Sequence, residues 1–224
     1  MKIKVNLMFC IFCITLLMLG CTKNEKYEYR KSGLEYFTYE NYEGAIVEFD
    51  KAINASSGII GGFEKDVLSY KGEALIRLGD YERAVSVYEK LKTMDKKNKD
   101  FQYLFYMSEA GKLESENDYE NAVVKYEEAL AIKENADIYN RLGICESELE
   151  NYEEALIYFA KGIALNDEDV LQILSKNEAI TYGLMRNYEI AIDKYEVYVK
   201  MYVDDADAAK ELAFFKSRVI DTDE

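Results

Sequence analysis

Hydrophobic positions follow two different patterns along this chain. Val5 to Leu19 form an almost unbroken apolar run, and the chain turns polar at Cys21. Further on, an alanine is followed four residues later by an aromatic residue, which places both on one face of a helix. This spacing recurs five times, at Ala45/Phe49, Ala84/Tyr88, Ala122/Tyr126, Ala155/Phe159 and Ala191/Tyr195. The pattern predicts a short hydrophobic leader followed by repeated amphipathic helices.

Polar positions repeat in step with these pairs. Each alanine lies three residues after the tyrosine of an Asn/Asp-Tyr-Glu motif, at residues 41–43, 80–82, 118–120, 151–153 and 187–189. The Asn or Asp is suited to cap a helix, because its side-chain oxygen can accept from free backbone amides of the first turn. The Glu two residues later then lies near the positive end of the helix dipole. We therefore expect a helix to begin at each motif.

A second small residue precedes each of these helices. Twelve residues before the alanines the chain has Gly33, Gly72, Ala110, Gly143 and Ala179. Small residues at both positions predict that a first helix crosses the second one closely, and we expect Ala155 to lie against Gly143. The aromatic residue is then expected to fill the gap to a neighbouring pair. Because one helix pair cannot bury such a face alone, the repeats predict a stack of pairs.

This register resembles the tetratricopeptide repeat, a family of 34-residue helix-turn-helix units. The small eighth and twentieth positions and the aromatic twenty-fourth position match, as does the twenty-seventh, with Ala52, Leu91, Ala129, Gly162 and Tyr198. The resemblance covers residues 26–203 and implies an all-α, right-handed α-solenoid of about five helix pairs. The approximate repeats are 26–59, 65–98, 103–135, 136–169 and 172–203. Residues 204–219 carry Leu212, Phe215 and Val219 on one side and predict a capping helix, before an acidic tail at 220–224.

Composition narrows the function. The chain has no histidine, which removes Ser-His-Asp triads, Cys-His dyads and Cys/His zinc sites. Its net charge of −15, from 28 basic and 43 acidic residues, argues against a nucleic-acid partner. We expect no enzyme activity, no metal and no cofactor.

The leader predicts export and anchoring. Lys2 and Lys4 precede the apolar run, as in a secretory signal, and its fifteen residues span about 22 Å as a helix, short of a bilayer core of about 30 Å. Residues 18–21, Met-Leu-Gly-Cys, resemble the lipobox of bacterial lipoprotein precursors. The resemblance implies a cleaved signal at 1–20, a lipidated Cys21 and a short tether at 21–25. The mature chain would be held by lipid alone on the extracytoplasmic side of a membrane of the cell envelope, with a net charge of −17 after Lys2 and Lys4 are removed.

The cysteines fit this division. Cys10 and Cys13 lie in the leader and Cys21 is assigned to lipid, so Cys145 remains the one free thiol of the mature chain. No intramolecular disulfide is then available. Cys145 occupies a repeat position that is usually small and internal, and we expect it to serve packing.

The resemblance also implies a binding groove. In that family the fifth, ninth and twelfth positions of the first helices line a concave groove. The corresponding residues are Arg30, Leu34, Phe37, Ser69, Glu73, Ile76, Met107, Gly111, Glu114, Asn140, Ile144, Ser147, Lys176, Ile180 and Gly183. Leu34 stands where the carboxylate clamp of some relatives needs Asn, so binding of a C-terminal carboxylate is not expected. The alternative is that the apolar members of this set merely pack on adjacent helices.

Two functions follow from anchor and fold together. The first is a membrane-anchored scaffold or adaptor that binds peptide or helical segments of other proteins, with basic segments favoured by the acidic charge. The alternative is a structural assembly factor for an envelope complex, such as the lipoproteins of outer-membrane barrel assembly or pilus-secretin pilotins. Relatives in barrel assembly typically carry Tyr-Pro steps between repeats, and this chain has no proline.

The anchor can be tested by replacing its cysteine. Cys21→Ser should leave an uncleaved or soluble product, because lipid is the only membrane attachment that the sequence predicts. Detergent phase partitioning measures this. If the serine variant still enters the detergent phase once the leader is removed, another attachment exists.

Overall fold

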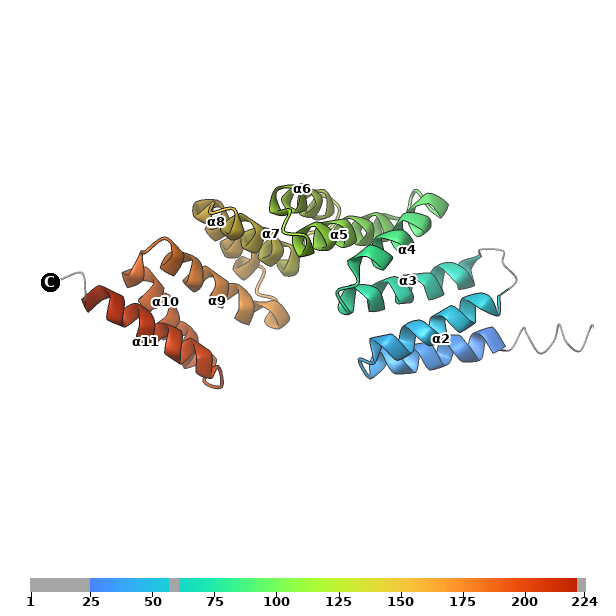
Figure 1. The fold of residues 1–224 in the computed structure, drawn as a ribbon, viewed down its shortest axis with the longest axis horizontal. Coiled ribbons are helices and arrows are strands. Elements are labelled where there is room, and N and C mark those ends of the chain that lie inside the picture. Colours follow the sequence, from blue (N-terminus) through green and yellow to red (C-terminus); the bar gives the residue numbers. More distant parts are fainter. Residues whose placement is uncertain (1–24, 57–60, 221–224) are drawn as a thin grey trace, which may run out of the picture. The chain divides into compact units, whose positions relative to one another are not determined.

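The computed structural model describes residues 25–56 and 61–220, so the predicted signal, Cys21 and the last four residues lie outside the described part. All regular structure within it is α-helical, in eleven helices with no strand, which confirms the predicted all-α fold. The chain forms two compact units, which divide between Ser108 and Glu109. In each unit, helices that follow one another in sequence lie alongside each other (Figure 1).

Unit 1 starts with a helix at residues 25–38, which is unlabelled in Figure 1. It continues with α2 (Tyr42–Asn54), α3 (Gly62–Arg77), α4 (Tyr81–Met94) and the first part of α5 (Lys99–Ser115). Unit 2 holds the end of α5, then α6 (Tyr119–Leu130), α7 (Ala136–Glu148), α8 (Tyr152–Ala164), α9 (Glu168–Leu184), α10 (Tyr188–Met201) and α11 (Ala206–Ile220). The even-numbered helices α2 to α10 are the second helices of the five expected pairs.

The Asn/Asp-Tyr-Glu motif starts each second helix, as predicted. The Asn or Asp is the N-cap residue in all five helices. Asn41, Asp80 and Asp118 accept a bond from the backbone amide three residues later, at 3.0–3.4 Å. The Asn151 side chain accepts no such bond. Its side-chain NH₂ group instead donates to the carboxylate of Glu146 in the preceding helix at 2.9 Å.

The turn before each motif has a fixed geometry. The residue ahead of the cap has a positive φ of 58–73° in all five turns, at Glu40, Gly79, Asn117, Glu150 and Arg186. The amide of each N-cap residue donates at 2.9 Å to the carbonyl five residues earlier, which is the Schellman arrangement. A left-handed backbone conformation costs a residue other than glycine about 1–2 kcal/mol, and four of these five residues are not glycine. The packing of the two flanking helices therefore determines the turn conformation, and the preference of the turn residue does not.

The recurring aromatic residue lies on the small residue of its own pair. A Cβ atom placed on Gly33 would lie 2.6 Å from the Phe49 ring, and one on Gly72 would lie 2.6 Å from the Tyr88 ring. At Gly143 the Phe159 ring is closer still. Gly143 is therefore small because the Phe159 ring occupies the place of its side chain. The ring also reaches the neighbouring pair, as expected. Phe49 stacks on Tyr70 of α3 with ring centroids 6.1 Å apart, and Phe159 shares one buried cluster with Leu174 of α9.

The capping helix closes the last pair. Phe215 of α11 covers Gly183 of α9, where a Cβ atom would clash with the ring. Asp205 caps α11 by accepting from the Ala208 amide, and it also accepts from Tyr198 of α10 and Lys176 of α9. These three bonds lower the pKa of Asp205 to about 2. One carboxylate thus ties α11 to both helices of the fifth pair.

The fit between ring and glycine predicts the cost of filling that space. Gly143→Val should lower the free energy of unfolding by about 1–3 kcal/mol, because Phe159 is buried and cannot move aside freely. Gly62→Val is the matched control, since a Cβ atom there meets nothing within 4 Å. Denaturant unfolding followed by circular dichroism compares the two. Equal losses at both sites would contradict the proposed fit.

Candidate functional site

Arg30 contacts two residues of α3 in its own unit. Its Nε donates to Asp66 of α3 at 2.5 Å, and its guanidinium lies 5.9 Å from the ring centre of Tyr70. The bond to Asp66 raises the pKa of Arg30. Arg30 was expected to line a groove, and the structure shows it joining the first helix to α3.

The apolar candidates of unit 1 belong to its core. Leu34 and Phe37 pack with Ala45, Phe49 and the other buried residues of the first two pairs. The Phe37 ring meets Tyr42 and Tyr70 edge-on, with centroids 5.4 and 6.1 Å apart. Ile76 is half-buried between two such clusters. For these three residues the structure shows the packing that was the alternative to binding.

The candidates on α5 are divided between the two units. In unit 1, Met107 is half-buried. In unit 2, Gly111 is buried, and Glu114 accepts from the Tyr126 hydroxyl at 2.5 Å and from Arg141 at 3.3 Å. Glu114 therefore holds α6 and α7 to the end of α5.

Polar side chains join α7 to α9 in unit 2. The side-chain NH₂ of Asn177 donates to the side-chain carbonyl oxygen of Asn140 at 2.9 Å. The hydroxyls of Ser147 and Thr181 are 3.3 Å apart. Asn140 and Thr181 are almost fully buried. Ile144 packs beside them on the cluster that contains Ala155 and Phe159. These residues fix the spacing of two consecutive first helices.

Two candidates on α9 are occupied by the capping helix. Lys176 pairs with Asp205 at 3.1 Å, and Gly183 lies beneath Phe215. The expectation that Gly183 lines an open groove is therefore wrong, and Lys176 faces α11. Lys176 and Ile180 are both half-buried, and Ile180 packs at the edge of the cluster that contains Ala179 and Tyr195.

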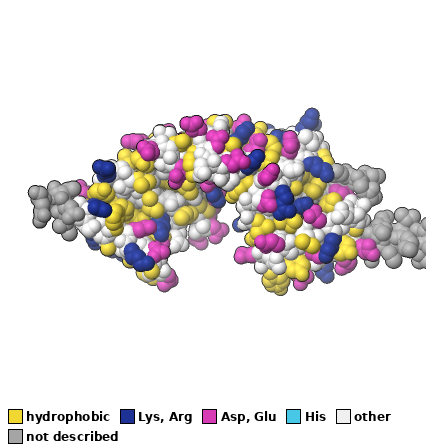
Figure 2. Space-filling view, in the orientation of Figure 1, with side chains coloured by type: hydrophobic (Ala, Val, Ile, Leu, Met, Phe, Trp, Pro, Cys, Tyr) yellow, Lys and Arg dark blue, Asp and Glu magenta, His cyan; other side chains and the backbone are white. Residues whose placement is uncertain are grey.

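An exposed apolar stripe runs along α9 beside Ile180. Ile173 is 43% exposed and Leu184 is 51% exposed, and with Ile180 they follow the spacing i, i+7 and i+11 of one helix face. We call these three residues the α9 stripe. Hydrophobic side chains gather over α9 in Figure 2. The half-buried Asn177 lies next to the stripe, where its amide group can bond to a peptide backbone.

Reasoning from family positions missed two members of this stripe. Ile173 and Leu184 are at the second and thirteenth positions of the fifth repeat, outside the fifth, ninth and twelfth positions that were carried over. Their common helical spacing with Ile180 was visible in the sequence. Their exposure was not, because it depends on where α7 and α11 pack.

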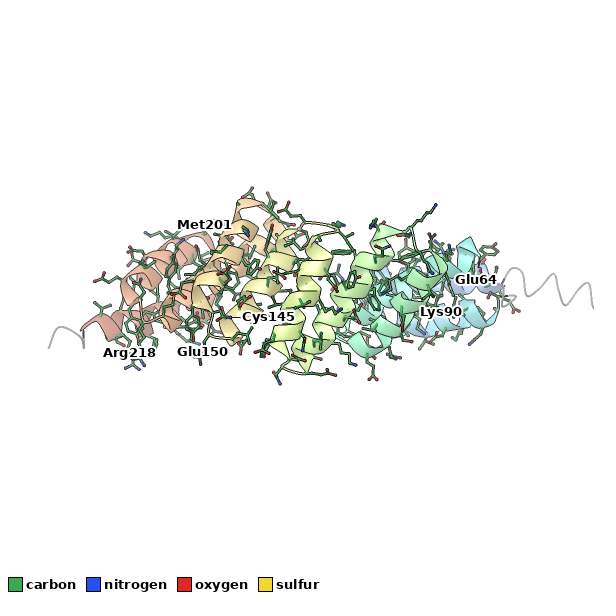
Figure 3. All side chains as sticks on the ribbon, turned by 90° about the horizontal axis from the view of Figure 1, so that it is seen from above. Glu64, Lys90, Cys145, Glu150, Met201 and Arg218 are labelled. Carbon is green, nitrogen blue, oxygen red and sulfur yellow. The ribbon has the colours of Figure 1, made fainter. Side chains whose placement is uncertain are left out.

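The one cysteine thiol among the described residues does not support a catalytic role. Cys145 is fully buried on α7 within the helices of unit 2 (Figure 3). Burial, and then the charge of Glu114, raises the pKa of this thiol to about 12. In the described residues, no group of three or more Cys, Asp or Glu side chains is placed to hold a metal ion. Nor is any helix there long and apolar enough to cross a membrane.

Comparison with known families detects the repeats directly. Residues 68–100 and 136–169 each match a model of the tetratricopeptide repeat. Two segments therefore match the tetratricopeptide repeat, one in each unit. A relative described as uncharacterized protein ycf37, from Guillardia theta, is 29% identical over 147 residues, covering 63% of this chain and 79% of that protein.

Solved structures share the architecture. MamA from Desulfovibrio magneticus RS-1, from residue 41 to its end, superimposes with a TM-score of 0.61 at 17% identity over 81% of this chain and 97% of that one. The apo form of RapI superimposes with a TM-score of 0.69 at 17% identity, covering 86% of this chain and 75% of that one. A thermophilic TPR protein from Thermus thermophilus superimposes with a TM-score of 0.58 at 15% identity, covering 85% of this chain and 98% of that one. At these identities the likeness shows the fold.

The burial of Cys145 predicts its reactivity. In a chain that starts after Cys21 it is the only cysteine, and at pH 8 a pKa of about 12 leaves about one thiol in 10⁴ ionised. Thiol reagents should react about a thousandfold more slowly than with an added exposed cysteine, Ser217→Cys, measured in a Cys145→Ala background. In denaturant both should react alike. Fast labelling of native Cys145 would show that α7 opens.

Proposed function

We propose that this chain is a membrane-anchored scaffold on the extracytoplasmic side of the cell envelope, which binds a segment of another protein along the first helices of unit 2. The observation that carries the proposal is the α9 stripe. Ile173 and Leu184 expose apolar surface on a stacked-helix scaffold in which the expected apolar positions Leu34, Phe37, Ile76 and Ile144 are used for packing.

The physical character of the surface favours a peptide partner. Large apolar side chains provide most of the affinity when a helical or extended segment binds a helical surface. The neighbouring Asn177 donates through its side-chain NH₂ to Asn140, and its side-chain carbonyl oxygen can accept from a backbone amide of the partner. The mature chain has a net charge of −17, which favours basic segments and predicts weaker binding as salt rises.

The anchor supports the same role. A lipid on Cys21 would leave only a few residues between the membrane and the first helix at residue 25, so a bound partner would be held close to the bilayer. The acidic surface would contribute little to membrane attachment, because anionic headgroups attract basic clusters. Binding without catalysis is the role we assign, and it needs no metal or cofactor.

The α9 stripe is tested by making it polar. Once crosslinking in native membranes has identified a partner, Ile173→Ser/Leu184→Ser should weaken its binding by at least about tenfold, equivalent to about 1.4 kcal/mol. Both side chains are largely exposed, so the helices should remain folded. Affinity is measured by titration calorimetry after circular dichroism has confirmed the melting temperature.

A matched control separates the stripe from exposed apolar surface in general. Val124→Ser/Ile157→Ser removes side chains of similar exposure, 51% and 46%, from second helices α6 and α8. This variant should bind as wild type does. If the stripe variant keeps its full affinity for the partner, the binding surface lies elsewhere.

A further inference from the structure

The fifth second helix, α10, differs from the other four at two register positions. Two residues after the motif tyrosine, α10 has Ile190, where the others have Gly44, Arg83, Asn121 and Glu154. Nine residues after it, α10 has Val197, where the others have Lys51, Lys90, Glu128 and Lys161. The four other pairs show that the fold accepts glycine, polar or charged residues at these positions. Packing of the repeat therefore does not explain Ile190 and Val197.

Both residues are exposed and lie in one line. Ile190, Lys194, Val197 and Met201 follow the spacing i, i+4, i+7 and i+11, which is one side of α10. Ile190 is 38% exposed, Val197 58% and Met201 60%. Met201 ends α10 and is labelled in Figure 3. An exposed apolar line of this length is unusual on the surface of an acidic protein.

The line forms one wall of a pocket of about 460 Å³. Ile163 of α8 lies across from it, and Ser175 and Glu178 of α9 also line it. Ser175 and Glu178 are on the side of α9 away from the α9 stripe, because they are two and five residues from Ile173. The pocket is thus a second surface, separate from the one assigned to the proposed function.

We propose that this α8–α10 pocket binds an amphipathic helical segment of a partner protein, whose apolar face carries a flanking Lys or Arg. From Ile190 to Met201 the line spans eleven residue steps, or about 16 Å, which matches three turns of a helix and is longer than a small ligand. Aliphatic and methionine side chains adapt to such helices.

The acidic side chains of the pocket favour a basic flank on the partner helix. Glu178 in the pocket is already paired with Lys194, whose Nζ lies 2.8 Å from both carboxylate oxygens. Asp193 lines the same pocket, is exposed, and has no ion-pair partner among the described residues. A cation on the partner would complete this pair, whereas an acidic flank would face Asp193 in a chain that is already strongly negative.

The test uses two synthetic helical peptides with the same leucine face, one flanked by lysines and the other by glutamates. Fluorescence anisotropy with the purified chain should show at least about tenfold tighter binding of the lysine peptide. Ile190→Glu/Val197→Lys brings in the residues that α8 has at these positions, Glu154 and Lys161, and leaves the net charge unchanged. It should reduce binding of the lysine peptide at least about tenfold.

Three further variants separate the possible causes. Asp193→Lys should remove or reverse the preference between the peptides. Val124→Ser/Ile157→Ser and the stripe variant Ile173→Ser/Leu184→Ser should each bind the lysine peptide as wild type does, which keeps this test independent of the proposed function.

Three outcomes would overturn the proposal. The first is no measurable binding of the lysine peptide to wild type, and the second is undiminished binding to folded Ile190→Glu/Val197→Lys. The third is a wild-type dimer in sedimentation that the same variant dissociates, because the pocket would then hold a second copy of this chain.

Discussion

The fold depends on an aromatic ring that lies against a residue with little or no side chain. In three pairs the second helix places a Phe or Tyr ring directly on a glycine of its partner helix, at Gly33, Gly72 and Gly143, and all five recurring rings are almost fully buried. An aromatic side chain buries about 150–250 Å², so one such contact supplies a large share of the apolar area that a pair can hide. At these glycines the ring occupies the space that a Cβ atom would fill.

This contact determines what the rest of each helix can do. Once the ring occupies the inside of the pair, the flanking apolar residues of the first helix become available to the neighbouring pair. Leu34, Phe37 and Ile76 are used in this way, and they join consecutive pairs in unit 1. Positions that line a groove in related proteins are therefore shared between packing and binding. Here packing takes most of them.

Exposed apolar surface gathers in the last part of the stack. Within unit 2, α11 packs over Lys176 and Gly183, and leaves Ile173 and Leu184 of the same helix uncovered. On the other side of α9, Ile190 and Val197 occupy positions that are glycine, polar or charged in the other repeats. The two assigned surfaces thus use opposite sides of one helix pair, and the earlier pairs supply scaffold and charge.

What the sequence determined by itself is local or periodic. The caps at Asn41, Asp80 and Asp118 and the small and aromatic register follow from residue types at fixed spacing, and these were enough for an all-helical stack of pairs. Helix starts are predictable because the capping side chain bonds to amides only two or three residues away.

Tertiary structure alone decided where each side chain was used. It placed Glu150 and Arg186 in left-handed turns, which neither residue favours, because two packed helices leave no other path between them. It also removed Gly183 from the expected groove and exposed Leu184, one residue further along. Burial depends on which helix, distant in sequence, packs over a face, and the spacing of residues within one helix does not contain that information.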